Sequence, residues 1–189
     1  MIFLLYLAQW ILVIVMLSVF LLLCFWTYTT ARAKVPFVPV PNATLEEIAR
    51  ELDIREGNVV YDLGSGDGRV LFYQAKRAPG ARFIGLDNNP FATMLAKIRK
   101  WASPKDIQDR VHLETKDFFT HDVSDATHVF MYLYPKVMDE LLPKLKKELK
   151  PGTKLVSMTF QFTDIRPKKE IDLHRAKYKL ARKLYVYEF

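Results

Sequence analysis

An acidic residue followed by alternating glycines is the first feature able to bind a ligand, in the run Asp62-Leu63-Gly64-Ser65-Gly66-Asp67-Gly68-Arg69. Glycines between a strand and a helix let a ligand approach the backbone, and the helix N-terminus offers unpaired N–H groups. A dinucleotide fingerprint would have Gly or Ala where this chain has Arg69. Asp62 precedes the glycines, which suits the cationic end of a ligand better than a phosphate. The run therefore predicts a binding loop that is not of the dinucleotide type.

A second acid lies at the distance expected for ribose recognition. The run Ile84-Gly85-Leu86-Asp87 is typical of a strand that ends in a carboxylate, and Asn88 follows it. In nucleotide-binding α/β folds, an acid about 20 residues beyond the glycines holds the ribose hydroxyls. The two acids and the glycines together predict a ligand that contains a ribose.

Aromatic residues end a later predicted strand, where Tyr132, Tyr134 and Pro135 stand close together. Ligands of such folds bind at the carboxyl edge of the sheet. An aromatic, carbonyl-lined slot at this edge would remove water from a group that binds in it. Side chains alternate along a strand, so for each tyrosine a place in the core is an equal alternative.

Strands and helices are predicted to alternate after an N-terminal capping box formed by Thr44 and Glu47, which starts a helix to about Leu52. The predicted strands are Val59–Leu63, Arg82–Leu86, Val111–Glu114, Thr127–Leu133 and Thr153–Phe162, with a final hairpin of Ile171–His174 and Lys183–Phe189. The predicted helices are Arg69–Lys76, Pro90–Trp101 with Asn89 as its cap, and Val137–Leu149. This order predicts an α/β fold with a mostly parallel sheet covered by helices on both faces.

The first 31 residues contain no charged side chain, and the stretch from Ile2 to about Tyr28 is almost wholly apolar. About 20 such residues span a bilayer as a helix. A cleavable signal peptide is the alternative, with Ala31-Arg32-Ala33 as a small-x-small site. Signal peptides normally begin with a positive side chain, which this chain lacks, and its apolar run is about twice as long as the usual apolar core of a signal peptide. We therefore predict a retained anchor. Arg32 and Lys34 follow the span, which predicts a single-pass membrane protein with its catalytic domain on the cytoplasmic side.

The proline-rich stretch after the span, with Pro36, Pro39 and Pro41, favours a stiff, extended linker. We therefore predict an anchor over 1–31, a linker over 32–42 and one catalytic domain over 43–189. A wholly disordered chain and a multi-domain protein are excluded by this length and apolar content.

The charge of +7 comes from the C-terminal third, because residues 136–189 carry 14 basic and 7 acidic side chains. A dense basic set there consists of Arg166, Lys168, Lys169, Arg175, Lys177, Lys179, Arg182 and Lys183. Contact with anionic lipid, contact with nucleic acid and a plain solvated face are the open interpretations. Nucleic acid is not expected, because Tyr178 and Tyr185 fit the alternation of a hairpin. The His residues show no ligand spacing and Cys24 is the only cysteine, so no metal site is predicted.

The glycine run and its two acids resemble the class I S-adenosylmethionine-dependent methyltransferases over roughly residues 42–189. The resemblance implies a seven-stranded, mostly parallel, Rossmann-like sheet with a C-terminal antiparallel hairpin, and S-adenosyl-L-methionine as the cofactor. It places Asp62 near the methionine part and Asp87 with Asn88 at the ribose, while Asp117 would hold the adenine amino group. It also places Gly64, Ser65, Gly66 and Gly68 beneath the cofactor. For Asp117 a loop cap is the alternative role.

A closer resemblance rests on Pro36-Phe37-Val38-Pro39, the glycine run, and Tyr132-Leu133-Tyr134-Pro135 before a Leu-rich helix. These pieces are similar to the small membrane-anchored protein-lysine methyltransferases, whose mitochondrial members modify lysines of inner-membrane proteins. The resemblance implies Tyr132, Tyr134 and Pro135 as catalytic residues and a lysine of a membrane or membrane-associated protein as substrate. Methylation of a small molecule or lipid, and a noncatalytic cofactor-binding assembly factor, are the alternatives.

The positive-inside pattern leads to a prediction about topology. Because Arg32 and Lys34 should hold the domain inside, protease added outside intact cells should spare residues 43–189. Immunoblotting of the protected fragment, compared with lysed cells as the control, measures this. Cleavage in intact cells, or a mature protein that starts near Lys34, would rule out the retained anchor.

Overall fold

The computed structural model describes residues 2–32, 38–173 and 182–189. The chain divides into two compact units, Met1–Pro36 and Phe37–Phe189. Residues 33–37 of the predicted linker, the residues Arg175, Lys177 and Lys179 of the predicted basic set, and His174 of the predicted hairpin lie outside the described residues. The predicted domain boundaries stay a prediction.

The first unit contains one long helix, α1 (Ile2–Arg32). Its stretch Ile2–Tyr28, 27 residues, is the one part of the described chain that is long and apolar enough to cross a membrane. Ser18 Oγ donates to the Ile14 carbonyl at 2.8 Å, and Thr27 Oγ1 donates to the Cys24 carbonyl at 2.9 Å. These hydroxyls are satisfied within the helix, which a nonpolar surrounding requires. Insertion and sidedness stay predictions.

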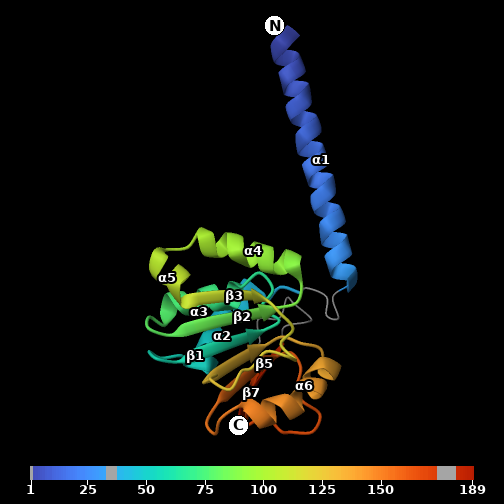
Figure 1. The fold of residues 1–189 in the computed structure, drawn as a ribbon. Helices are drawn as coiled ribbons and strands as arrows, with labels where there is room; N and C mark the ends of the chain where they lie inside the picture. The colour runs from blue at the N-terminus through green and yellow to red at the C-terminus, as the bar shows by residue number, and fades with distance from the viewer. Residues whose placement is uncertain (1, 33–37, 174–181) are drawn as a thin grey trace. The chain divides into compact units, whose positions relative to one another are not determined.

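The second unit is built around a seven-stranded sheet in the order β3-β2-β1-β4-β5-β7-β6 (Figure 1). Strands β1 to β5 are parallel where they pair, whereas β7 runs antiparallel to both β5 and β6. The strands are β1 (Val59–Leu63), β2 (Arg82–Asp87), β3 (Val111–Thr115), β4 (His128–Met131), β5 (Lys154–Met158), β6 (Lys169–Asp172) and β7 (Lys183–Glu188). The predicted fold, with its mostly parallel sheet and C-terminal antiparallel strands, is confirmed.

Helices cover both faces of this sheet, as the alternation along β4 shows. Val129 and Met131 pack in the cluster that contains the apolar side of α6, whereas Phe130 packs with α2 on the opposite face. The helices of this unit are α2 (Leu45–Leu52), α3 (Arg69–Arg77), α4 (Pro90–Trp101), α5 (Lys105–Arg110) and α6 (Pro135–Glu148). Figure 1 shows α2 and α3 behind the sheet and α6 in front of it.

Several predicted boundaries were wrong where the backbone turns away from the strand direction. β5 ends at Met158 instead of Phe162, because Thr159 adopts the left-handed conformation with φ of +72°. β4 ends at Met131, and Pro135 belongs to the first turn of α6, where its missing N–H is tolerated. Helix α5 was not predicted.

The capping box predicted for Thr44 and Glu47 is also wrong. Thr44 Oγ1 donates to the Pro41 carbonyl at 2.8 Å and lies in a 3-10 turn, Asn42–Thr44, ahead of α2. The hydroxyl therefore does not accept from the helix N-terminus, and one carboxylate oxygen of Glu47 is buried without a partner. Thr44 has φ of −103° and ψ of −4°, so its backbone continues the turn instead of adopting the extended conformation typical of an N-cap residue.

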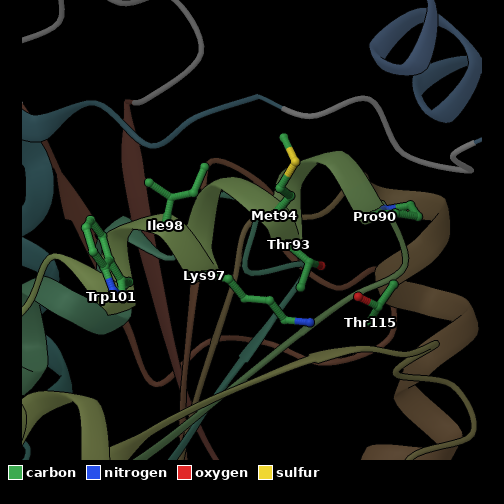
Figure 2. A pocket seen from close by; sticks show the side chains of 7 residues that line it. All are labelled: Pro90, Thr93, Met94, Lys97, Ile98, Trp101 and Thr115. Atoms are coloured by element: carbon green, nitrogen blue, oxygen red, sulfur yellow. The ribbon is translucent and has the colours of Figure 1, made fainter. Parts of the chain in front are cut away.

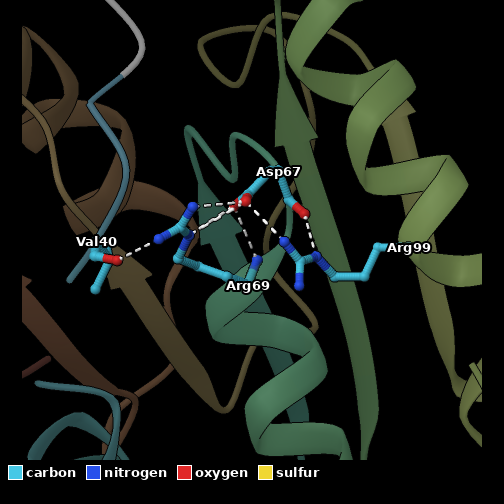
Figure 3. Close-up of polar contacts among 4 residues, drawn as sticks. All are labelled: Val40, Asp67, Arg69 and Arg99. Carbon is cyan, nitrogen blue, oxygen red and sulfur yellow. Dashed lines mark hydrogen bonds and ion pairs between the residues drawn. The ribbon is translucent and has the colours of Figure 1, made fainter. Parts of the chain in front are cut away.

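Asp67 forms the main polar junction between the glycine loop and its surroundings (Figure 3). Its Oδ2 accepts from Arg69 at 2.8 Å and from Arg99 of α4 at 2.8 Å. Arg69 donates in turn to the Val40 carbonyl at 2.8 Å. The carboxylate side chain is only 9% exposed, so these charged hydrogen bonds are partly shielded from water. They connect the start of the unit, the loop after β1 and α4.

The Asp67 junction predicts a pH-dependent contribution to stability. Burial raises the pKa of Asp67, but the hydrogen bonds and charges of Arg69 and Arg99 outweigh burial and leave that pKa below its ordinary value. A folded-state pKa below the unfolded one stabilises the fold above the unfolded pKa, near 4, and this stabilisation is lost as pH falls through the folded value. Asp67→Asn should therefore lower the free energy of unfolding by about 2 to 3 kcal/mol at neutral pH.

Urea unfolding of the full chain in detergent, at neutral pH and in steps below about pH 4, measures this difference between wild type and variant. Asp109→Asn is the control, because that exposed carboxylate pairs only with the neighbouring Lys105 on the surface of α5. The difference for Asp67→Asn should shrink on acidification. A difference that stays constant with pH would contradict the ionic role.

Candidate active site

The glycine loop follows β1 and turns sharply into α3. Gly64, Gly66 and Gly68 have φ of +82°, +56° and +72°, values that favour glycine strongly. The N–H groups of Gly64 and Ser65 donate to the Leu86 carbonyl at 2.8 and 3.1 Å. The loop is thereby joined to the end of β2, one residue before Asp87.

Two of these glycines also lie where a side chain would collide. A Cβ on Gly64 would approach Leu133 Cδ2 to 2.9 Å, and one on Gly68 would approach Phe72 Cε2 to the same distance. Leu133 belongs to the predicted aromatic segment that follows β4. The loop after β1 and the segment after β4 are therefore in contact.

Asp87 is the most highly connected of the predicted cofactor residues. Its Oδ2 accepts from the Gly66 N–H at 2.8 Å and its Oδ1 accepts from the Asn89 N–H at 2.8 Å. Burial raises the pKa of Asp87, although these two hydrogen bonds act in the opposite direction. Asn88, next to it, is exposed. The geometry leaves Asp87 at the carboxyl edge of the sheet, beside the loop.

Asp62 lies at the end of β1 and is 2% exposed. Its side chain makes no hydrogen bond within residues 38–173 and 182–189, the described part of this unit. Burial, followed by the charges of Asp87 and Asp67, raises the pKa of Asp62 well above its usual range. A buried carboxyl group beside two further acids is a favourable place for the cationic end of a ligand. S-adenosylmethionine, with an ammonium and a sulfonium, fits this requirement.

Asp117 lies close to Asp87 in the fold, because the N–H of the preceding residue, Lys116, donates to the Asp87 carbonyl at 3.1 Å. Its Oδ1 accepts from the Phe119 N–H at 2.9 Å, as a loop cap does. The side chain is half-buried. Asp117 is thus near Asp87 in the fold, while one of its own carboxylate oxygens already has a partner.

The tyrosines predicted as catalytic meet a third aromatic ring that sequence reasoning missed. The Phe160 ring lies 6.4 Å from that of Tyr132 and 5.7 Å from that of Tyr134, measured between centroids. Tyr132 is half-buried and burial raises its pKa, whereas Tyr134 is 42% exposed. Pro135 is exposed at the start of α6 and fixes the backbone there.

The position of Phe160 depends on backbone contacts around the left-handed Thr159. The Thr159 N–H donates to the Lys183 carbonyl at 2.8 Å, and Ser157 Oγ donates to the Phe160 carbonyl at 2.8 Å. The sequence predicted Phe160 as part of a strand. A positive φ is rare for a β-branched residue such as Thr159, so nothing in the sequence predicted that the strand would end there. Among the described residues, no three His, Cys, Asp or Glu side chains gather to hold a metal ion.

Comparison with known proteins identifies the family and the fold. The family described as "ANTKMT methyltransferase domain" matches residues 62–169. This chain belongs to that family. A protein-lysine N-methyltransferase of Saccharolobus islandicus is 34% identical over 154 residues, which cover 80% of this chain and 93% of that protein. The adenine nucleotide translocase lysine N-methyltransferase of Mus musculus is 31% identical over 138 residues, 72% of this chain, but this chain spans only 58% of the mouse protein.

A solved structure of the same kind supports the assignment. The crystal structure of an RNA methyltransferase from Salinibacter ruber, in complex with S-adenosyl-L-homocysteine, has a TM-score of 0.71 and 34% sequence identity. The match covers 80% of this chain and 93% of that one. By family and fold the chain is an S-adenosylmethionine-dependent methyltransferase, as its glycine motif predicted.

The contacts of Asp87 lead to a prediction about cofactor affinity. Asp87→Ala removes the acceptor of the Gly66 N–H and the acid assigned to the ribose, and a lost hydrogen-bond acceptor of this kind costs about 1 to 3 kcal/mol. Affinity for S-adenosylhomocysteine should fall by about 5- to 150-fold. Titration calorimetry on the full chain measures it, with circular dichroism to verify folding and Asp109→Ala as the control. Unchanged affinity in Asp87→Ala would defeat the ribose assignment.

Proposed function

We propose that this chain transfers a methyl group from S-adenosylmethionine to a lysine side chain of a protein located at a membrane. The observation that carries the proposal is the contact between the two predicted halves of the site. Leu133, between Tyr132 and Tyr134, lies directly against Gly64 of the glycine loop. An acceptor held by the aromatic rings would therefore lie next to a cofactor held by the loop.

In this proposal the glycine loop and three acids hold the cofactor. Asp62 would face the cationic methionine end, Asp87 and Asn88 the ribose, and Asp117 the adenine. Gly64, Ser65, Gly66 and Gly68 would let the cofactor approach the backbone. The cofactor supplies a methyl group already activated by a positively charged sulfur, so the protein has to align an amine and exclude water.

The rings of Tyr132, Tyr134 and Phe160 would receive the acceptor side chain. A lysine has a four-carbon stem that packs on aromatic faces, and its ammonium is attracted to them. Partial burial between the rings removes water from the amine and lowers its pKa, so the neutral, nucleophilic form becomes accessible. Pro135 would act by fixing the direction in which Tyr134 leaves β4. The names of the archaeal and mouse relatives support lysine as the acceptor.

The candidate span Ile2–Tyr28 supports the membrane part of the proposal. An anchored enzyme meets membrane-associated substrates at a raised effective concentration. Cytoplasmic orientation follows from Arg32 and Lys34. Contact of the C-terminal basic set with anionic lipid has less support, because three of its lysines are already in ion pairs. Lys168 pairs with Glu188, Lys169 with Glu51 and Lys183 with Glu170.

The acceptor prediction can be tested with radiolabelled methyl donor and membrane proteins from cells that lack this chain. The full chain, reconstituted in vesicles, should add label and mass increments of about 14 Da to lysine. Tyr134→Ala should lower kcat/KM at least about tenfold, a loss of about 1.4 kcal/mol, because the aromatic wall is removed. Affinity for S-adenosylhomocysteine should stay unchanged.

Tyr134→Phe is the matched control and should keep most of the activity, because it retains the ring. The Salinibacter ruber relative is named an RNA methyltransferase, so total RNA is assayed in parallel. Label in RNA and none in lysine would refute the proposed acceptor class. Equal activity of wild type and Tyr134→Ala would refute the role of the aromatic rings.

A further inference from the structure

Two large apolar side chains of α4, Ile98 and Trp101, lie exposed on its outward face, next to the half-buried Met94. Met94, Ile98 and Trp101 follow one another at helical spacing, a stripe that in a globular protein normally faces the core. The structure instead buries the small face, with Ala92, Thr93 and Ala96. Ile98 is 55% exposed and Trp101 is 81% exposed. Figure 2 shows Met94 and Ile98 pointing away from the strands.

The inward face of α4 is small because the helix packs closely on the glycine loop. A Cβ built on Gly68 would lie 3.3 Å from the Cβ of Ala96, so the glycine at position 68 allows the loop and α4 to approach each other closely. Arg99 of the same helix binds Asp67, which holds this close approach. The packing explains which residues face inward. It does not explain why the outward face carries methionine, isoleucine and tryptophan instead of polar residues.

The stripe borders a groove of about 520 Å³ whose lining includes Lys97 and Thr115. Lys97 is exposed and its side chain runs toward Thr115 (Figure 2). Tryptophan and lysine together favour a boundary between lipid and water: the indole has an apolar body with a polar N–H, and the lysine stem lies on lipid while its ammonium reaches water. Isoleucine and methionine add apolar surface.

The sequence brings a bilayer within reach of this surface. Five residues, 33–37, separate Arg32 at the end of α1 from Val38, and a fully extended chain spans at most about 3.6 Å per residue. Chain length alone therefore limits Val38 to about 20 Å from Arg32. A stable protein dimer needs about 20 to 30 residues on each side, more than one narrow helical stripe offers. Lipid therefore fits the surface better than a second copy.

We propose that the outward face of α4, formed by Met94, Lys97, Ile98 and Trp101, inserts into the lipid–water interface. The proposal rests on the anchoring given under Proposed function. α4 begins directly after Asn89, which lies two residues beyond Asp87, so lipid contact would place the cofactor edge of the sheet close to the bilayer surface. A lysine just outside the membrane is then within reach of the site.

Tryptophan fluorescence tests the proposal directly, because Trp101 is the only tryptophan outside α1. One variant, with Trp10→Phe and Trp26→Phe, reports on Trp101 alone. A second variant, with Trp26→Phe and Trp101→Phe, reports on Trp10. The full-length variants are reconstituted in vesicles of phosphatidylcholine and phosphatidylglycerol that carry quenchers at shallow or deep positions of the acyl chain. Trp101 should be quenched by the shallow quencher more than by the deep one.

The Trp10 variant separates failure of this proposal from failure of the anchor. Quenching of Trp10 without quenching of Trp101 overturns lipid contact by α4 and leaves the anchor in place. Quenching of neither removes the anchor, and the present proposal with it. Emission of Trp101 that shifts to the blue with rising protein density, without quenching by lipid, assigns the face to a protein partner and also overturns the proposal.

A paired activity measurement relates this surface to the choice of substrate. Ile98→Ser with Trp101→Ser should lower the rate on a vesicle-embedded substrate about tenfold, which corresponds to about 1.4 kcal/mol of lost lipid contact. The rate on a soluble peptide with the same lysine should stay within about twofold, because that reaction does not depend on lipid contact. Lys105→Ser, which changes an exposed residue of α5, is the control. Equal losses on both substrates would show a structural defect and would overturn the proposed role.

Discussion

The hydrogen bond from the Gly66 N–H to the Asp87 carboxylate, at 2.8 Å, is the contact on which the site depends. It joins the loop after β1 to the end of β2, and only a glycine with positive φ presents its N–H in that direction without strain. The Asp87 carboxylate also accepts a hydrogen bond from the Asn89 N–H. The Asn89 side chain in turn caps α4 by accepting from the backbone N–H groups of Phe91 and Ala92. One carboxylate therefore sets the position of a loop and the direction of a helix.

Three carboxylates in this region have different environments, and the differences define what can bind. Asp67 is neutralised by Arg69 and Arg99, and Asp87 is stabilised by backbone N–H groups. Asp62 has neither kind of partner among the described residues, and it is buried. Burial, with the charges of Asp87 and Asp67, raises the pKa of Asp62 well above its usual range, so the fold on its own favours the neutral form of this carboxyl group. A cation bound at the end of β1 would favour the carboxylate form, so binding of a cation and ionisation of Asp62 would support each other.

The sequence predicted the parts of the fold that depend on short-range patterns, and it failed where distant contacts decide. The strand, glycine run and helix around Asp62 were predicted correctly because local turn chemistry and apolar periodicity agree there. Thr44 was misassigned because a threonine hydroxyl can bind either helix amides or a preceding carbonyl, and the 3-10 turn before α2 brings it to the Pro41 carbonyl. Phe160 was missed because its place depends on the positive φ of Thr159 and on a hydrogen bond to Lys183, a residue of the last strand. The roles of the site residues stay predictions.

The orientation of α4 shows why apolar periodicity alone does not identify a core face. Helical spacing marks Met94 and Ile98 as equivalent to core positions, yet the structure buries Ala92, Thr93 and Ala96 and leaves Ile98 55% exposed. Ala96 lies on the side of α4 that approaches the glycine loop, so close packing on that loop, and not apolar periodicity, accompanies the buried face. Exposed apolar area of this kind often marks an interaction surface, and in a chain with a candidate membrane span the proposed contact with lipid would account for it.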